Sequence, residues 1–328
     1  MKALSESCVL CGSNFSYAVL EENGYALVRC LQCGLLYVKS PPDLNELRSW
    51  YETGHATSVE MDTQIRLRNK GMLVAEDDLD RIQKYVQTGT MLEVGCGAGH
   101  FLYSARRRGF DVTGVEFNRK FVEFASDQLG LKVLPGTVAD VDFLAGSFDV
   151  AYLRNVLSHM ADPIGDFRII RSWVKDNGYL FVETGNFPEL ADDTIRRMQT
   201  ARPLGIPDHM FFFSEKHFRS LMEMTGFDMV SKQEFSTVFH DWFYNVIEDR
   251  AKRTLRDVKP GTQKSSFKEK FISRVWYFSM YGIGSALPKN NRPCTVKYVC
   301  RAKIGQRLPD DNSPPFSTPT SFTRRRKT

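Results

Sequence analysis

The sequence predicts an α/β protein with a doubly wound, mainly parallel sheet, and three features lead to that prediction. Between about residues 89 and 186, short apolar runs that suit strands alternate with helical stretches. A glycine-rich turn joins the first of these runs to the first helix. Strands that alternate with helices imply βαβ units, whose strands lie parallel in one sheet. A chain of 328 residues has room for such a core and for smaller additions.

The expected elements of the core follow one another in a regular order. The strands are expected at residues 91–94, 111–116, 132–134, 148–153 and 178–183. The helices between them are expected at residues 100–108, 119–129 and 163–174. After residue 186 the pattern loosens, until a helix is predicted over 214–225 with Ser214 as its N-cap. Further strands are expected at 227–230 and 294–301.

Composition divides the chain into five segments. Residues 1–42 carry two Cys-x-x-Cys pairs among short β-like runs, and residues 43–88 suit a helical linker or lid. The α/β core occupies residues 89–238. Residues 239–304 form a helical, aromatic-rich region in which substrate specificity is expected to reside. Residues 305–328 are rich in Pro, Ser, Thr and Arg and are expected to be a disordered tail.

Charge and hydropathy restrict the class of protein. The net charge of +5 is largely due to the run Arg-Arg-Arg-Lys at 324–327, so the remainder is nearly neutral and argues only weakly for nucleic acid. No apolar run is long enough to span a bilayer, and the first eight residues lack the apolar centre of a signal peptide. We therefore expect a cytoplasmic protein without a membrane segment.

The glycine-rich turn at residues 95–99 predicts a ligand. Glycine at 95, 97 and 99 lets the backbone approach a bound molecule closely. The spacing Gly-x-Gly-x-Gly departs from the dinucleotide fingerprint, and no Gly-Lys-Ser/Thr follows as in a P-loop. Glu116 ends the next strand, where its carboxylate could accept hydrogen bonds from both hydroxyls of a ribose. These features favour nucleoside binding over a plain turn with an exposed glutamate.

Four of the seven cysteines form two Cys-x-x-Cys pairs, Cys8 with Cys11 and Cys30 with Cys33. Two such pairs on neighbouring turns can offer four thiolates as a tetrahedron, which is typical of a closed structural zinc site. A reducing compartment favours metal over disulfides, and a redox pair would normally stand alone near a βαβ unit. We therefore predict a zinc ribbon. Four unrelated cysteines are the alternative.

The ordered motifs resemble those of the class I methyltransferases that use S-adenosylmethionine. The resemblance covers about residues 85–230 and is carried by LEVGCGAGHFL, VTGVEFN, SFDVAYLRNVLSHMADP and GYLFVETGN. It implies a Rossmann-like methyltransferase sheet with S-adenosylmethionine as cofactor. Because a sulfonium is already an activated methyl donor, positioning of the acceptor can supply much of the catalysis.

The resemblance also implies which residues hold the methionine part and the ribose of the cofactor. Glu116 would bind the ribose, and Phe117 would lie beside the adenine. The residues implied at the methionine part lie in and just before the glycine turn: Glu93, Gly95, Cys96, Gly97 and Gly99.

The remaining implied contacts come from two later turns. Thr137 and Val138 would flank the adenine, although many relatives carry an acidic residue where this chain has Thr137. Asp140 or backbone groups would then take over that contact with the adenine amine. The residues implied beside the sulfonium are Leu153, Arg154 and Asn155.

The cysteine pairs bear on the acceptor. Together with Arg29, Pro41 and the pair Trp50-Tyr51, they are similar to a bacterial methyltransferase subgroup that often modifies sugars, surface polysaccharides or natural products. A small-molecule acceptor is therefore expected. Because a zinc ribbon also precedes some ribosomal RNA methyltransferases, an RNA methyltransferase is the alternative. Residues 1–40 hold as many glutamates as lysines and arginines, which disfavours it. A non-catalytic nucleoside-binding scaffold is a second alternative.

Two histidines are candidates for handling a proton. The segment from Asp208-His209 to Phe213-Ser214 resembles the acidic-His-x-x-x-Phe-Ser segment of sugar-nucleotide C-methyltransferases, where the histidine takes a proton. Asp208 would orient the imidazole of His209 and raise its basicity. The alternative is that His209 only helps to close a lid. His159 follows the fourth strand at the ligand-binding edge, as a catalytic or a structural residue. His217 is expected on a solvated helix face.

Overall fold

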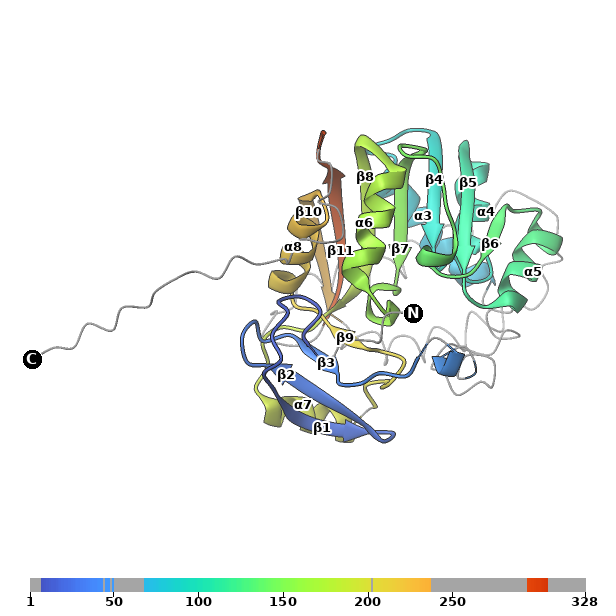
Figure 1. Ribbon diagram of the computed structural model, residues 1–328. Helices are drawn as coiled ribbons and strands as arrows, with labels where there is room; N and C mark the ends of the chain where they lie inside the picture. The colour runs from blue at the N-terminus through green and yellow to red at the C-terminus, as the bar shows by residue number, and fades with distance from the viewer. Residues whose placement is uncertain are drawn as a thin grey trace, which may run out of the picture.

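The computed structural model describes residues 7–43, 45–47, 49, 68–201, 203–236 and 294–305. These residues form two sheets, a larger one with helices on both faces and a smaller one beside its lower end (Figure 1). Several expectations lie outside the described residues. They are the helical region at 240–285, most of the linker, Trp50-Tyr51 and the tail beyond Gly305. None of the described helices is both long enough and apolar enough to cross a membrane.

The larger sheet has seven strands in the order β10-β11-β8-β7-β4-β5-β6. The pairs β4–β5, β4–β7, β5–β6 and β7–β8 are parallel, whereas β11 is antiparallel to both β8 and β10. The strands are β4 (Gly89–Val94), β5 (Phe110–Glu116), β6 (Val133–Pro135), β7 (Phe148–Arg154), β8 (Val174–Asn186), β10 (Phe227–Ser236) and β11 (Cys294–Ala302). The predicted doubly wound α/β sheet is confirmed, and the strand order reverses at β4, where such sheets bind ligands.

Helices cover both faces of this sheet (Figure 1). On one face lie α3 (Arg68–Ile82), α4 (His100–Arg107) and α5 (Arg119–Leu129), with Leu79, Leu102 and Ala125 in a shared core. On the other lie α6 (Pro163–Trp173) and α8 (Glu215–Met224). There the ring of Phe218 stacks on that of Tyr298 at 3.9 Å between centroids. The central strands are therefore buried on both sides, as a parallel sheet requires.

Local signals in the sequence account for several helix ends. The side chain of Asn118 accepts a hydrogen bond from the backbone N–H of Lys120 and begins α5, and Gly130 ends it with a φ of 60°. Ser214 caps α8 as predicted, because its side chain accepts from the backbone N–H of His217. The expected helix at 119–129 matches the observed one to the residue.

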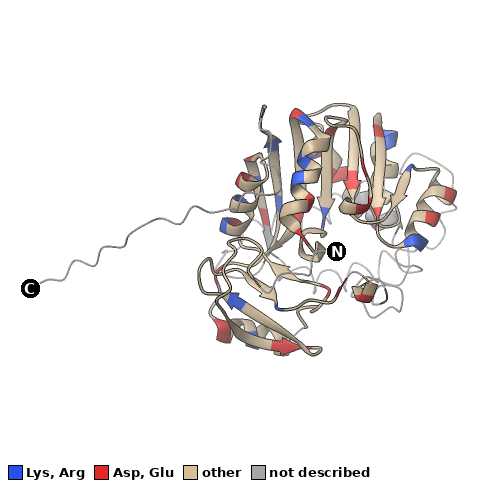
Figure 2. Ribbon diagram, in the orientation of Figure 1, with Lys and Arg blue, Asp and Glu red and all other residues tan. Residues whose placement is uncertain are grey.

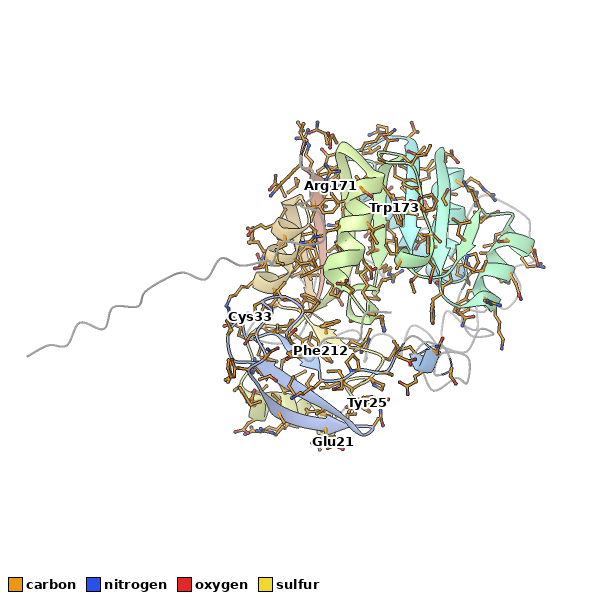
Figure 3. All side chains as sticks on the ribbon, viewed as in Figure 1. Glu21, Tyr25, Cys33, Arg171, Trp173 and Phe212 are labelled. Atoms are coloured by element: carbon orange, nitrogen blue, oxygen red, sulfur yellow. The ribbon has the colours of Figure 1, made fainter. Side chains whose placement is uncertain are left out.

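The smaller sheet has the order β1-β2-β3-β9 and contains a strand that the sequence did not reveal. Its strands are β1 (Ser16–Glu22), β2 (Tyr25–Cys30), β3 (Leu36–Val38) and β9 (Phe211–Phe212). Helix α7 (Asp192–Ala201), also unforeseen, packs against β1 through a core that includes Val19, Ile195 and Ile206. The cysteine-bearing segment is thus completed by residues from beyond β8. In Figure 3, Phe212 lies where the two sheets approach.

Candidate functional site

The glycine turn after β4 has a shape that only glycine supports. Gly95, Gly97 and Gly99 all have positive φ, at 69°, 51° and 77°. A Cβ on Gly95 would stand 2.4 Å from Cγ2 of Val156, and one on Gly99 would stand 2.7 Å from Cδ1 of Leu131. The turn is therefore packed closely against its neighbours, with Gly95 and Gly97 half-buried and Gly99 buried.

Glu116 is joined directly to this turn. Its Oε2 accepts from the backbone N–H of Gly97 at 2.7 Å, and its Oε1 accepts from that of Asn118 at 2.8 Å. The side chain is 9% exposed, and burial raises the pKa of its carboxyl although the backbone N–H groups of Asn118, Gly97 and Phe117 act in the opposite direction. A carboxylate has about four acceptor positions, so Glu116 keeps acceptor capacity for a ligand. The structure thus brings together the two predicted parts of the nucleoside site.

Glu93 places a second carboxylate beneath the turn, and one of its oxygens needs a partner. The residue is 4% exposed, and its Oε2 has no hydrogen bond within the part of the chain that the structure describes. Burial raises its pKa well above the usual value, against the opposing effects of Arg154 and the backbone N–H of Leu102. A buried polar atom without a partner is costly, so Oε2 is available to a donor or cation on a ligand.

The turn after β6 lies beside Glu116. The backbone N–H of Gly136 donates to the Glu116 carbonyl at 2.9 Å, which brings Thr137 and the buried Val138 next to the end of β5. The Thr137 backbone N–H and hydroxyl donate to Oδ2 of Asp140 at 2.8 and 2.9 Å. This oxygen is therefore engaged in the turn, which leaves the backbone as the simpler source of contacts to a nucleobase. Phe117, half-buried, follows Glu116 directly.

Three other residues predicted to contact the cofactor, Leu153, Cys96 and Asn155, differ in how far their side chains are exposed. The side chains of Leu153 and Cys96 are buried, and Cys96 packs on Gly114, where an added Cβ would stand 2.7 Å from its Sγ. Their backbones, rather than their side chains, border the turn. Asn155 is exposed and has a φ of 53°, while its N–H donates to the Glu183 carbonyl at 2.8 Å. Positive φ is uncommon outside glycine and often occurs at functional sites.

The three residues predicted to handle a proton lie together. Each of His159, Asp208 and His209 offers one ring nitrogen or carboxylate oxygen, and these atoms lie within 4.8 Å of one another. The two imidazole centroids are 4.7 Å apart. His159 lies in the short helix η2 (Leu157–His159) after β7, whereas the other two precede β9. Val156, which packs against Gly95, immediately precedes η2, so the cluster is connected to the predicted cofactor loop.

The pairing inside this cluster differs from the expected one. Nδ1 of His159 lies 3.0 Å from Oδ1 of Asp208 and 2.9 Å from its carbonyl oxygen. The carboxylate that was expected to orient His209 therefore faces His159. Nδ1 of His209 instead donates to the Leu204 carbonyl at 2.7 Å. Adjacency in the sequence suggested that Asp208 binds His209, but in the fold the two neighbouring side chains have different hydrogen-bond partners.

His209 is held as a neutral base. A carbonyl oxygen only accepts, so Nδ1 carries the hydrogen and Nε2 carries the lone pair. Burial and the neighbouring His159 lower the pKa of His209, while the Leu204 carbonyl, Asp208 and Glu22 act to raise it. The net lowering keeps the imidazole unprotonated near neutral pH. Nε2 can therefore accept a proton.

The four cysteines of the two pairs converge on one point. The Sγ atoms of Cys8 and Cys33 are 3.5 Å apart, those of Cys11 and Cys30 are 3.4 Å apart, and all four lie within 4.8 Å of one another. A tetrahedral zinc ion with Zn–S distances of about 2.3 Å would place its sulfurs about 3.8 Å apart. The pKa of Cys33 is lowered to about 5 because the thiol of Cys8 donates to it. The set therefore fits a structural zinc ion.

The two cysteine turns have the same backbone pattern. Gly12 donates to the Cys8 carbonyl at 2.8 Å, and Gly34 donates to the Cys30 carbonyl at 3.0 Å. Gly12 and Gly34 follow their cysteine pairs and have φ values of 71° and 84°. Each pair therefore sits in a tight turn that presents both sulfurs to the same side.

His217 connects the four-cysteine cluster to helix α8. The expectation that His217 lies on a solvated helix face was wrong. The residue is 3% exposed rather than solvated. Its Nε2 lies 3.0 Å from the Cys33 carbonyl, and its Nδ1 accepts from the backbone N–H and hydroxyl of Ser214. The periodicity of α8 shows which face is apolar, but it gives no sign of the cysteine turn that covers the polar side.

The region of the chain that contains this site matches a known protein family. The profile of a family described as a methyltransferase domain matches residues 68–232. The ubiquinone biosynthesis O-methyltransferase of Vibrio campbellii is 27% identical over 148 residues, which cover 41% of this chain and 62% of that protein. Phosphoethanolamine N-methyltransferase 3 of Arabidopsis thaliana is 27% identical over 194 residues, covering 56% of this chain and 35% of that protein. The match therefore spans less than two thirds of either relative.

Solved structures of similar shape have low sequence identity. A putative sarcosine dimethylglycine methyltransferase from Galdieria sulphuraria has a TM-score of 0.48 at 15% identity, over 80% of this chain and 99% of that one. Geranyl diphosphate C-methyltransferase from Streptomyces coelicolor has a TM-score of 0.47 at 14% identity, over 69% of this chain and 76% of that one.

The family profile covers half of the 328 residues, from α3 through most of β10, and the chain belongs to the methyltransferase domain family.

Proposed function

We propose that the protein transfers a methyl group from S-adenosylmethionine to a small-molecule acceptor. The observation that carries this proposal is the contact between the glycine turn and Glu116, with the unpartnered carboxylate oxygen of Glu93 beneath it. All three lie at the carboxyl ends of β4 and β5, where the strand order reverses. When bound, S-adenosylmethionine supplies a methyl group that is already activated by a sulfonium.

The residues of the site suit the chemical groups of this cofactor. The carboxylate of Glu116 would accept hydrogen bonds from the ribose hydroxyls at its remaining acceptor positions. Oε2 of Glu93 would accept a hydrogen bond from the ammonium of the methionine part, which would offset the cost of burying that carboxylate. Phe117 and the backbone at Thr137 and Val138 would surround the adenine. The backbone at Leu153 and Asn155 would border the methyl group.

His209 is the proposed general base. Its Nε2 takes the proton that the acceptor atom loses as its electron pair forms the new bond to carbon. Hydrogen bonding of Nδ1 to the Leu204 carbonyl fixes the tautomer that this step needs. His159, held by Asp208, lies beside it and helps to keep His209 neutral before the proton is taken, because it lowers the pKa of His209. This role applies when the acceptor carries a proton that must leave.

We further propose a sugar, polysaccharide or natural-product intermediate as the acceptor. The support comes from the cysteine turns and the acidic-His-x-x-x-Phe-Ser segment, which occur together in this chain. Relatives named for ubiquinone biosynthesis and for phosphoethanolamine also favour a small molecule. The six cysteines whose side chains the structure describes are all without disulfides, which suits a reducing, cytoplasmic setting.

The RNA alternative gains little from the charge distribution. Among the residues that the structure describes, Figure 2 shows lysines and arginines interspersed with aspartates and glutamates, without a basic concentration on the smaller sheet. Arg29, the cation of the cysteine-bearing sheet, forms an ion pair with Asp192 at 2.8 Å. It is therefore already engaged, whereas binding to a phosphate backbone needs several available cations.

Transfer of a labelled methyl group tests the proposal. The full chain would be incubated with S-adenosylmethionine carrying a tritiated methyl group and with separate pools of sugar nucleotides, phenols, amines and transfer or ribosomal RNA. We expect label in a small-molecule pool, and a loss of at least tenfold in rate for His209→Ala. Label confined to RNA would support the alternative enzyme. Cofactor binding without transfer to any pool would support the scaffold.

A further inference from the structure

Glu22, the last residue of β1, is buried against the loop that carries His209. Its side chain is 8% exposed. Oε1 accepts from the backbone N–H groups of Gly205 and Ile206 at 2.9 and 3.0 Å, and Oε2 accepts from that of Leu204 at 3.0 Å. Three consecutive backbone donors thus converge on one carboxylate. Hydrogen bonds to a charged acceptor are stronger than neutral ones, so the loop is firmly held.

The same loop residues hold His209 from the other side. The Leu204 carbonyl accepts from Nδ1 of His209 at 2.7 Å, and the Gly205 carbonyl accepts from its backbone N–H at 2.8 Å. Gly205 has a φ of 82°, and a Cβ there would stand 2.7 Å from Nδ1 of His209. The imidazole therefore packs directly on the glycine. Any shift of residues 204–206 would move the carbonyl that sets its tautomer.

The adjacent turn residue adds a second contact from the same hairpin. Nδ2 of Asn23 donates to the Ile206 carbonyl at 2.7 Å. Residues 22 and 23 lie 182 to 184 positions before the loop residues that they bind. The β1–β2 hairpin, which belongs to the cysteine-bearing sheet, therefore grips a loop that belongs to the proposed active site.

We propose that Glu22 is a positioning residue, through which the β1–β2 hairpin fixes the place and the Nδ1–H tautomer of His209. This inference rests on the proposed function for its catalytic meaning, because the orientation of His209 matters most if that residue is the base. The smaller sheet would then support catalysis by holding the loop that carries His209. This role accounts for the sheet without a nucleic-acid substrate.

The position and the pKa of His209 depend on the negative charge of Glu22 as well as on the shape of its side chain. A glutamine at position 22 would keep one acceptor oxygen but would turn an N–H₂ group toward backbone donors that need an acceptor. The charged and titratable groups that face His209 are His159, Asp208 and Glu22. Removing the charge at position 22 and loosening the Leu204 carbonyl both remove interactions that favour the protonated imidazole. Both changes therefore lower the pKa of His209 further.

Nitrogen-15 spectra of the imidazole groups test this inference without any acceptor. Wild type and Glu22→Gln full-length proteins would be compared, with the His209 signals assigned by their loss in His209→Ala. Glu21→Gln is the matched control, because Glu21 precedes Glu22, is exposed and lies at the outer edge of the hairpin (Figure 3). We expect a single Nδ1–H tautomer in wild type and in Glu21→Gln. In Glu22→Gln we expect a mixture of tautomers and a titration midpoint at lower pH.

A second variant keeps the test decisive if Glu22→Gln does not fold. Asn23→Gly tolerates the φ of 53° at this position and removes the donor to the Ile206 carbonyl without adding a charge. It should change the His209 signals in the same direction as Glu22→Gln, though less. A folded Glu22→Gln or Asn23→Gly protein with the wild-type tautomer and midpoint would overturn the inference.

The two proposals can fail separately. If His209→Ala keeps full methyl transfer while Glu22→Gln alters the His209 tautomer, the base assignment is wrong and the positioning role stands. If His209→Ala abolishes transfer but Glu22→Gln leaves the tautomer, the midpoint and the transfer rate unchanged, the base assignment stands and the positioning role is wrong. Calorimetric binding of S-adenosylmethionine should be the same in wild type, Glu22→Gln and Glu21→Gln, because Glu22 contacts no residue of the glycine turn.

Discussion

Nδ1 of His159 lies 3.0 Å from Oδ1 of Asp208, although 49 positions separate the two residues in the chain. His159 follows β7 at the carboxyl edge of the larger sheet, and Asp208 precedes β9 of the smaller one. The bond therefore joins the end of the methyltransferase core to the loop that carries His209. A second bond, from the Met210 N–H to the Ser158 carbonyl at 2.7 Å, reinforces the junction. The proposed catalytic cluster is assembled across this seam.

This relationship predicts a stability effect for Asp208→Ala, which removes the acceptor. The aspartate is 2% exposed and accepts a hydrogen bond from an imidazole. Loss of a buried hydrogen bond to a charged group should lower the free energy of unfolding by about 1.5–3 kcal/mol. The control is Asp193→Ala, whose carboxylate is 76% exposed and should change stability by less than about 1 kcal/mol. Urea unfolding would measure both, and equal values would show that the pair contributes nothing beyond a surface contact.

Alanine substitutions at two glycines of similar φ, one in the cofactor turn and one outside it, distinguish the cost of backbone strain from the cost of a packing clash. Gly95→Ala combines a left-handed backbone with a Cβ 2.4 Å from Val156, whereas Gly146→Ala at a φ of 65° meets no atom closer than 3.9 Å. Each should cost about 1–2 kcal/mol for the backbone, and Gly95→Ala about 1–3 kcal/mol more for the clash. Only Gly95→Ala should also abolish cofactor binding. Thermal unfolding and calorimetry measure the two effects, and a Gly146→Ala protein that loses binding would contradict this assignment.

The sequence predicted the parts of the site that depend on local signals. The turn at 95–99 was predictable because glycine adopts positive φ more readily than other residues. Glu116 was predictable because it ends a strand in a region where strands and helices alternate regularly. The helix at 119–129 has both an asparagine N-cap and a glycine end, so its bounds could be read directly. In each case a residue type has a specific physical reason to occupy its position.

The remaining parts depend on long-range contacts that leave no local pattern. β9 has two residues, too few for any periodicity, and it pairs with β3 far upstream. Glu22 resembled the neighbouring exposed Glu21 in sequence, and only the fold shows that it binds three backbone donors. The partner of Asp208 was mistaken for the same reason. Adjacency along the chain pointed to His209, while the fold placed His159 there.

Zinc content should follow the four clustered cysteines and no other. Wild-type protein purified without added metal is expected to hold about one zinc ion per chain, in line with a closed four-cysteine site. Cys33→Ser should hold well under half of that amount and unfold at a lower temperature, because metal binding contributes to folding. Cys300→Ser is the control, since Cys300 is buried in strand β11 and does not belong to the group of four clustered sulfurs. Elemental analysis that finds zinc in Cys33→Ser and wild type alike would refute the assignment.

His209 should contribute to acid destabilisation. Its pKa in the folded protein is lowered below its ordinary value, mainly by burial, so the unfolded chain binds more protons when the pH falls below about 6.5. Stability is therefore present above that pH and is lost as the pH falls toward the folded-state pKa, by at most about 1.4 kcal/mol per pH unit for one proton. His209→Gln should flatten this part of the profile. Urea unfolding between pH 5 and 7.5 would show it, and parallel profiles would mean that His209 titrates normally.

The most direct measurement of the central claim is calorimetric titration of the full chain with S-adenosylmethionine. We predict one binding site in wild type and at least tenfold weaker binding in Glu116→Gln, because the substitution removes charged acceptors at the ribose position. Glu123→Gln, an exposed change on the neighbouring helix α5, should bind like wild type. Absence of binding by wild type, or equal affinity in Glu116→Gln and wild type, would contradict the account.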